Sequence, residues 1–254
     1  MVRLWEEKGY VRVKEHPTAV NIWWNKVGDI LLYDRPNHDW RLAAPAEERS
    51  WKFALFGNPK PPAGAEGTSP WFFWPRRPKL VEEKVSKGIG SWEERSKEIV
   101  FYGKTENKVQ ERRRTTANWS DACSGERSEW VMVKGNEAYP FTQSEYIDNL
   151  ALAKFGLCLA GYGYKCHREV ECMALGTVPL VAPECDMDSY YDPPVEGKHY
   201  IRVKTPEEAK EVASSMTKES WEEMSKACHE WWKRNCSVEG SFRLTSEINF
   251  KNTK

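Results

Sequence analysis

The sequence has no long apolar segment and no excess of charge of either sign. None of its apolar runs approaches the roughly 18 to 20 residues that span a bilayer. The N-terminal stretch MVRLWEEKGYVRVKEH lacks the apolar core of a signal peptide. The 38 Lys and Arg residues balance the 38 Asp and Glu residues, so no global field attracts the chain to nucleic acid or anionic lipid. We therefore expect a cytoplasmic protein with no membrane span and no nucleic-acid partner.

Paired cysteines are also missing. The seven cysteines are odd in number and include no C-x-x-C pair. Cys158 and Cys172 lie in apolar surroundings, where free thiols behave as small hydrophobic groups. We expect a reducing compartment and no zinc site.

Tryptophan is abundant, and most of it lies early in the chain. Of the 13 Trp residues, those at positions 5, 23, 24, 40, 51, 71, 74 and 92 lie in the first 92 residues. Core packing is the ordinary role of any one of them, but indole faces also stack on sugars. As a group they favour an N-terminal half that faces a carbohydrate.

Strand and helix patterns alternate through much of the chain. Apolar runs predict strands at 29–33, 52–56, 97–102, 130–133, 155–159 and 178–182. Helix patterns occur at 108–118, 142–153, 166–175, 206–216 and 218–235. The second of these helices is predicted to have a Thr142 cap and an apolar face at Tyr146, Leu150 and Ala153. The segment 61–70 is predicted to be an irregular loop, and Pro75 and Pro78 are expected to prevent a helix there. The alternation predicts an α/β fold with a parallel, doubly wound sheet.

The most informative stretch is FGLCLAGYGYKCHREVECMALGTVPLVAPE, residues 155–184. It predicts a buried strand, a glycine-rich turn, a helix, a glycine and a second buried strand. His167, Arg168 and Glu171 share one face near the start of the helix. That end of a helix at the mouth of a parallel sheet suits a diphosphate, and a carboxylate there can accept hydrogen bonds from a ribose diol. The alternative is a surface salt bridge between Arg168 and Glu171, which would be worth less than about 1 kcal/mol.

A second group of cations follows the predicted strand 97–102. Gly103-Lys104 opens a turn, and the three arginines 112–114 lie on the basic helix predicted beyond it. Free N–H groups and cations can neutralise a leaving diphosphate. The alternative is a solvated basic helix face. The spacing is not that of a Walker phosphate loop.

The segment ECMALGTVPLVAPE, Glu171 to Glu184, resembles the donor-site signature of GT-B glycosyltransferases. The wider stretch 155–184 is similar to the exostosin-like family and its viral and algal relatives, and the resemblance extends over about residues 97–205. It implies two Rossmann-like domains that face each other across a cleft. The C-terminal domain would bind the donor nucleotide, and Glu171 would bind the ribose of that nucleotide. It also implies that the loop at Gly103-Lys104 holds the diphosphate.

One departure from the family pattern bears on stereochemistry. Many retaining GT-B enzymes carry a second glutamate where this chain has Gly163. Its absence favours inversion, as the exostosin-like resemblance also implies. Inversion needs a general base that deprotonates the acceptor hydroxyl. Asp34, at the end of strand 29–33, is our candidate for this base; Asp39 and the pair Glu47-Glu48 are rivals.

The resemblance and the residues together define the expected protein. We expect a compact GT-B fold with an acceptor-side domain at 1–92 and a donor-binding domain at 93–254, the last helix returning to the first domain. The expected activity is inverting transfer of a sugar from a nucleotide-diphospho sugar, UDP-linked and with UDP-xylose as one candidate, to a hydroxyl of a glycan or glycoprotein. No separate cofactor is expected. The residues predicted to bind the nucleotide are Gly103, Lys104, Arg112, Arg113, Gly161, Tyr162, Gly163, Tyr164, His167, Arg168 and Glu171.

Other interpretations remain. Asp186-Met187-Asp188 resembles the D-x-D metal site of the other glycosyltransferase fold, but we expect it to shape a loop without a metal. The chain could instead be a non-catalytic carbohydrate-binding protein that retains the fold. A nucleic-acid binder using the run ERRRTT conflicts with the neutral net charge. A dinucleotide oxidoreductase conflicts with Cys166 in place of the third glycine of G-x-G-x-x-G.

Overall fold

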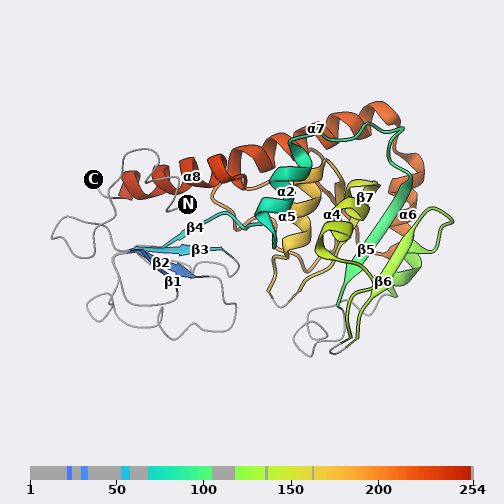
Figure 1. Ribbon diagram of the computed structural model, residues 1–254, viewed down its shortest axis with the longest axis horizontal. Helices are drawn as coiled ribbons and strands as arrows, with labels where there is room; N and C mark the ends of the chain where they lie inside the picture. Colours follow the sequence, from blue (N-terminus) through green and yellow to red (C-terminus); the bar gives the residue numbers. More distant parts are fainter. Residues whose placement is uncertain are drawn as a thin grey trace.

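The computed structural model describes residues 22–24, 30–33, 53–57, 68–104, 118–134, 137–161 and 163–252. They form an α/β structure with two sheets, and every strand pairing within both sheets is parallel. Figure 1 shows the two sheets separated along the long axis of the molecule. The α/β class and the parallel sheets predicted from the sequence are confirmed.

The larger sheet has the strand order β6-β5-β7-β8-β9. Its strands are β5 (Lys97–Gly103), β6 (Glu129–Met132), β7 (Ala153–Cys158), β8 (Val178–Val181) and β9 (Ile201–Arg202). Strands β7 and β8 are buried along their whole length, as expected for parallel strands covered on both faces. The chain first steps from β5 to β6 and then reverses to β7 on the other side of β5. This order places a topological switch point between β5 and β7.

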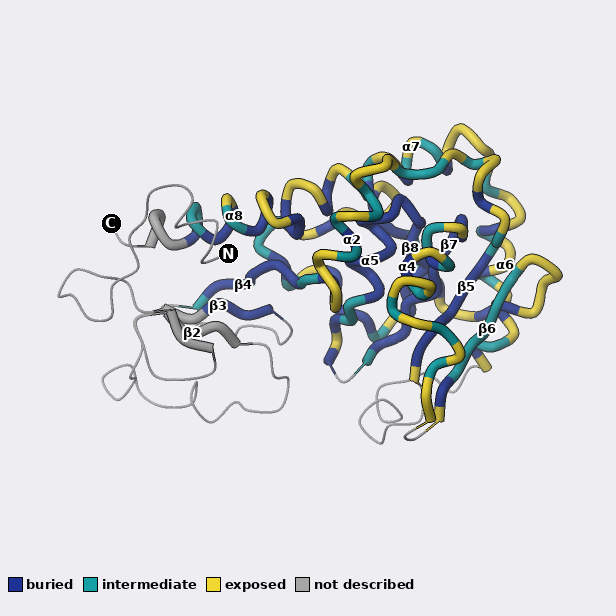
Figure 2. Tube along the Cα trace, in the orientation of Figure 1, coloured by how far each residue is buried: buried dark blue, intermediate teal, exposed yellow. Residues whose placement is uncertain are grey.

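Two groups of helices cover this sheet. Helices α4 (Gln143–Ala151) and α5 (His167–Leu175) contact each other and β7, and α2 (Pro78–Val85) packs on both. The 3-10 helix η2 (Trp119–Cys123) contacts β5, β6 and α6 (Pro206–Ser215). The long helix α7 (Lys218–Asn235) packs along α5. Figure 2 shows α5, β7 and β8 buried, whereas α6 and α7 alternate buried and exposed residues.

The smaller sheet has the order β1-β2-β3-β4. Its strands are β1 (Ile22–Trp24), β2 (Ile30–Tyr33), β3 (Phe53–Phe56) and β4 (Thr68–Pro70). Helix α8 (Val238–Asn252) extends back from α7 toward this sheet (Figure 1). The Trp71 Nε1 donates to Thr245 Oγ1 at 2.9 Å, which ties α8 to the chain just after β4. The domain boundary at residue 92 stays a prediction.

Capping residues explain where the site helices begin and end. The predicted Thr142 cap is confirmed at the start of α4, where Thr142 forms a capping box with Glu145. Cys166 precedes α5, and its backbone N–H is held by the Glu169 carboxylate at 2.7 Å. Gly176 ends α5 at φ 68°, a left-handed conformation that favours glycine. These local features fix the first turn of α5 against the sheet.

Several sequence predictions need correction. Pro78 does not prevent a helix but begins α2, because the first position of a helix needs no N–H donor. The predicted loop 61–70 ends in strand β4, whose Pro70 is tolerated because β4 is an edge strand. Helix α8 was not predicted. The helix predicted at 108–118 lies outside the described residues, except for its last position.

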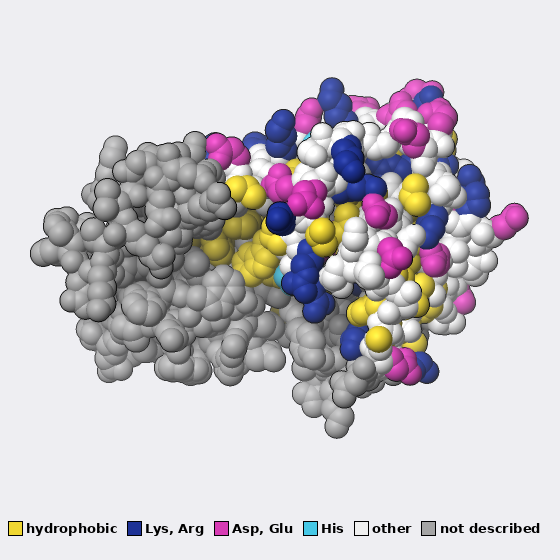
Figure 3. Space-filling model, in the orientation of Figure 1, with side chains coloured by type: hydrophobic (Ala, Val, Ile, Leu, Met, Phe, Trp, Pro, Cys, Tyr) yellow, Lys and Arg dark blue, Asp and Glu magenta, His cyan; other side chains and the backbone are white. Residues whose placement is uncertain are grey.

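Among the described helices, none combines the length and the apolar character that a bilayer crossing requires. Charged side chains of both signs are intermingled on the visible face of the described part (Figure 3). No extended basic surface is present on that face.

Candidate functional site

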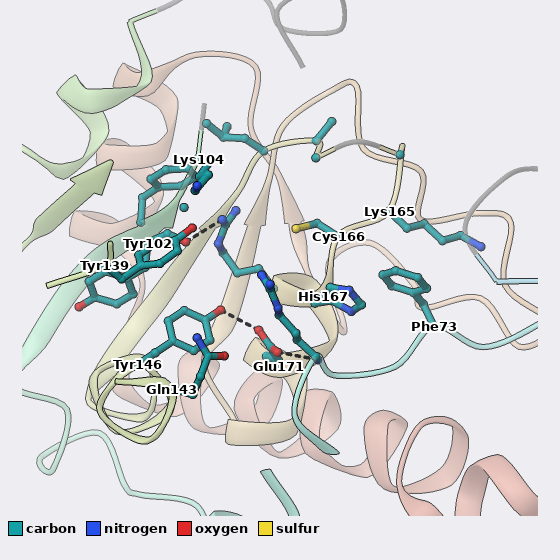
Figure 4. Close-up of a pocket in the computed structure, with 18 of the residues that line it drawn as sticks. Phe73, Tyr102, Lys104, Tyr139, Gln143, Tyr146, Lys165, Cys166, His167 and Glu171 are labelled. Carbon is teal, nitrogen blue, oxygen red and sulfur yellow. Dashed lines mark hydrogen bonds between the residues drawn. The ribbon is translucent and has the colours of Figure 1, made fainter. Parts of the chain in front are cut away.

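A cavity of about 500 Å³ opens where β5 and β7 end, at the switch point of the larger sheet. Its walls come from the ends of these strands, the first turns of α5, the start of α4 and the connection between β4 and α2. At a switch point the connections that follow the two neighbouring strands run in opposite directions. They therefore separate and leave a crevice in which ligands bind. Figure 4 shows the side chains that line it.

The end of β5 is shaped around Arg168. The Arg168 Nη2 donates to the Tyr102 carbonyl at 2.8 Å, and its guanidinium lies 4.3 Å from the Phe101 ring centroid. A Cβ on Gly103 would overlap Arg168 Nη2. Glycine at 103 therefore makes room for the guanidinium. Lys104 follows on the same wall of the cavity.

Glu171 lies on the second turn of α5 and lines the cavity, but its side chain is only 2% exposed. Its Oε1 accepts the backbone N–H of Arg76 at 2.8 Å, and its Oε2 accepts the Tyr146 hydroxyl at 2.7 Å. Both bonds are drawn in Figure 4. Each carboxylate oxygen has two lone pairs, so each retains one for a ligand as far as the described residues are concerned. Burial and the neighbouring Glu171 raise the pKa of Tyr146 well above its usual range, which keeps its hydroxyl a donor.

His167 joins the first turn of α5 to the connection after β4. Its ring stacks on Phe73 with centroids 4.8 Å apart, and its Nδ1 lies 2.7 Å from the Trp74 carbonyl oxygen. A carbonyl can only accept, so Nδ1 carries a proton. In the neutral ring Nε2 is then the acceptor.

Cys166 and Glu169 complete the start of α5. Burial raises the pKa of Cys166 to about 11, so its thiol is not an anionic nucleophile near neutral pH. Burial raises the pKa of Glu169 to about 8. Glu169 is fully buried and holds the Cys166 N–H, which makes it a structural residue of this turn.

Lys165 connects the cavity wall to the smaller sheet. It is 2% exposed, and its Nζ donates to the Gly57 carbonyl at 2.9 Å and to the Ser189 carbonyl. Gly57 directly follows β3. This lysine was not among the residues predicted from the sequence.

The structure brings most of the described candidate residues together. Those that line the cavity are Gly103, Lys104, Gly161, Gly163, His167, Arg168 and Glu171. The alternative of a surface salt bridge is wrong, because Arg168 and Glu171 are both buried and form no ion pair with each other among the described residues.

Tyr164 lies elsewhere. It is 41% exposed and lines a separate cavity near the ends of β8 and β9. We correct its assignment, because the turn carries its side chain away from the switch point. Further predicted residues lie outside the described part of the chain: Asp34, Asp39, Glu47, Glu48, Arg112, Arg113, Arg114 and Tyr162.

Sequence reasoning missed residues that reach the cavity from other segments. Tyr146 was assigned to the apolar face of its helix, yet its hydroxyl contacts Glu171. Arg76 lies in a proline-rich connection that carries no recognisable motif. Tyr139, Phe141 and Gln143 also line the cavity and were not predicted.

The Asp186-Met187-Asp188 segment shapes a loop after β8. Asp186 is 5% exposed, and its Oδ1 accepts the N–H groups of Asp188 and Ser189 at 3.1 and 3.0 Å. This capping arrangement agrees with the loop role expected from the sequence. Asp186 and Asp188 line the second cavity, with Tyr164 and not with Glu171.

No family model matches the sequence, and no curated protein matches it. Two similar solved structures are glycosyltransferases. One is the C-terminal domain of a group 1 family glycosyl transferase, LpcC, from Francisella tularensis: identity is 10%, coverage is 65% of this chain and 96% of that chain, and the TM-score is 0.39. The other is AviGT4, a glycosyltransferase involved in avilamycin A biosynthesis: identity is 12%, coverage is 89% and 75%, and the TM-score is 0.42.

Proposed function

We propose that this chain is a glycosyltransferase that moves a sugar from a nucleotide-diphospho sugar to a hydroxyl of a glycan or glycoprotein, with inversion. The observation that carries the proposal is the composition of the switch-point cavity. Its lining combines the Glu171 carboxylate, held by α4 and the β4–α2 connection, with the cations Lys104 and Arg168 at the end of β5. A nucleotide diphosphate has the matching groups, a ribose diol and an anionic linkage.

The contacts of Glu171 and Arg168 suggest which part of the nucleotide each residue would bind. The two hydroxyls of a ribose would donate to the free lone pairs of Glu171, whose position Tyr146 and the Arg76 N–H already fix. The diphosphate would lie toward Arg168, which the Tyr102 carbonyl holds in place. Charge-assisted hydrogen bonds contribute about 1.5–3 kcal/mol each, so three or four suffice for micromolar affinity.

In the proposed reaction the acceptor oxygen attacks the anomeric carbon from the face opposite the leaving group. The bond from that carbon to the diphosphate oxygen breaks, and its electron pair leaves with the diphosphate. A general base takes the acceptor proton; Asp34 stays our candidate for it. The cations stabilise the charge that develops on the diphosphate. A UDP-linked donor, with UDP-xylose as one candidate, is part of the proposal, and no cofactor besides this co-substrate is proposed.

A thermal-unfolding screen against UDP, GDP, UMP and free sugars tests the proposal. We expect a nucleoside diphosphate to raise the unfolding temperature of the wild type and to lose this effect in Glu171→Gln. Glu126→Gln, at an exposed position that does not line the cavity, is the matched control and should respond like the wild type. Stabilisation by free sugars alone would instead favour a non-catalytic carbohydrate-binding protein. No response to any nucleoside diphosphate would refute the proposed transferase.

A further inference from the structure

The connection between β4 and α2 is fastened to the site helix at two points. The Arg76 N–H donates to Glu171 Oε1 at 2.8 Å, and the Trp74 carbonyl accepts from His167 Nδ1 at 2.7 Å. The two backbone groups are two residues apart, and their partners His167 and Glu171 are one helical turn apart on α5. The backbone of this connection is therefore fixed at the cavity mouth.

These anchors leave the Arg76 side chain available. Arg76 is exposed and lines the same cavity as Arg168. Its backbone makes the bond to Glu171, and within the described part of the chain its guanidinium forms no hydrogen bond or ion pair. An arginine guanidinium without an internal partner at the rim of a cavity is well suited to a bidentate anion contact.

The charges of Arg76 and Arg168 both influence Tyr139 on the cavity wall. Burial raises the pKa of Tyr139, and the charges of Arg168 and Arg76 both oppose that increase. Tyr139 is on the cavity wall. The two arginines are therefore both within electrostatic reach of one ring, although they belong to different segments of the chain.

The described lining carries two more positive charges than negative ones. Its cations are Arg76, Lys104, Lys165 and Arg168, and its carboxylates are Glu137 and Glu171. A diphosphate diester carries two negative charges near neutral pH. The two negative charges of such a ligand would neutralise the net positive charge of the described lining. Without Arg76, one negative charge of the ligand would have no counterpart in that lining.

We propose that Arg76 binds the diphosphate of the donor together with Arg168. Arg76 belongs to the connection between β4 and α2 and not to the larger sheet or its helix α5. This inference rests on the proposed function, because the diphosphate is that of the nucleotide. It goes beyond it by assigning a residue that none of the sequence motifs contains. It also implies that the contact distinguishes a nucleoside diphosphate from a monophosphate.

Titration calorimetry of UDP, UMP and inorganic pyrophosphate on three full-length proteins tests this assignment. Arg76→Gln removes the guanidinium and keeps the backbone N–H that holds Glu171. Arg77→Gln is the control, because Arg77 is an exposed neighbour that does not line the cavity. Unfolding midpoints and circular dichroism establish that all three proteins are folded.

We expect Arg76→Gln to weaken UDP and pyrophosphate by about tenfold or more, the ordinary size of a hydrogen bond to a charged group. UMP affinity should change less, and Arg77→Gln should bind like the wild type.

Equal UDP affinity for Arg76→Gln and Arg77→Gln would overturn the role of Arg76 and leave the transferase proposal standing. A wild type that binds neither UDP nor GDP would overturn the transferase proposal. In that case, pyrophosphate binding that depends on Arg76 would still support an anion site, and its absence would overturn the site as well.

Discussion

Replacing Gly103 by alanine should disturb the site through a single added methyl group. Its Cβ would overlap Arg168 Nη2 and lie 3.0 Å from the Phe101 ring. The backbone of Gly103 is not in the left-handed region, so alanine can adopt its conformation. Any cost therefore comes from displacing the guanidinium that donates to the Tyr102 carbonyl at 2.8 Å.

The expected cost combines two opposing effects. Overpacking and the loss of a charged hydrogen bond cost about 1–3 kcal/mol of unfolding free energy. Alanine offsets about 0.5–1 kcal/mol of this, because glycine is entropically unfavourable within a strand. We expect a net loss of about 1–2 kcal/mol, or a decrease of roughly 2–8 °C in melting temperature for a chain of this size. UDP affinity should fall by about tenfold because Arg168 no longer faces the diphosphate.

Urea denaturation of a double-mutant cycle isolates the contact. In an Arg168→Ala background the overlap is gone, so the cost of Gly103→Ala should largely disappear, with a coupling energy of about 1–2 kcal/mol. Gly161→Ala is the matched control in the same cavity. Among the described residues its Cβ would meet only Cys166, with Sγ at 3.7 Å and Cβ at 4.0 Å, which are ordinary van der Waals contacts. An unchanged stability of Gly103→Ala, or an equal loss in both backgrounds, would refute the reasoning.

Two further predictions concern buried charges near α5. Burial raises the pKa of Glu169 from 4.5 to about 8, so the folded chain holds a proton that the unfolded chain has lost between these values. The contribution of Glu169 to the free energy of unfolding should therefore fall as the pH rises from 4.5 to about 8. Urea denaturation should show it as a wild-type stability that falls over this range relative to that of Glu169→Gln, which keeps the acceptor for the Cys166 N–H; parallel pH profiles would contradict it. Arg95→Met removes a buried donor that holds the Leu175 carbonyl at 2.8 Å and several other acceptors. It should cost about 3 kcal/mol or more, whereas Arg127→Met, at a side chain 60% exposed in an ion pair, should cost under about 1 kcal/mol; equal losses would contradict the role of Arg95.

The sequence alone determined the local elements around the site and much of their order. Continuous apolar runs predicted β5, β7 and β8, because a parallel strand covered on both faces is apolar along most of its length. The Thr142 cap predicted the start of α4. Gly103 and the first turns of α5 were placed near the mouth of the sheet because strand ends and helix starts alternate along the chain.

Tertiary structure decided which side chains meet at Glu171. The partners of its carboxylate are Arg76, 95 positions earlier, and Tyr146, 25 positions earlier. Neither separation produces a pattern in the sequence, because periodicity reports which face of an element is buried and not what that face touches. For the same reason Tyr164 was assigned to the cavity although the turn carries it away. Local sequence determined most of the elements around the site, and only the packing of α4, α5 and the β4–α2 connection around the switch point brought the charges into one cavity.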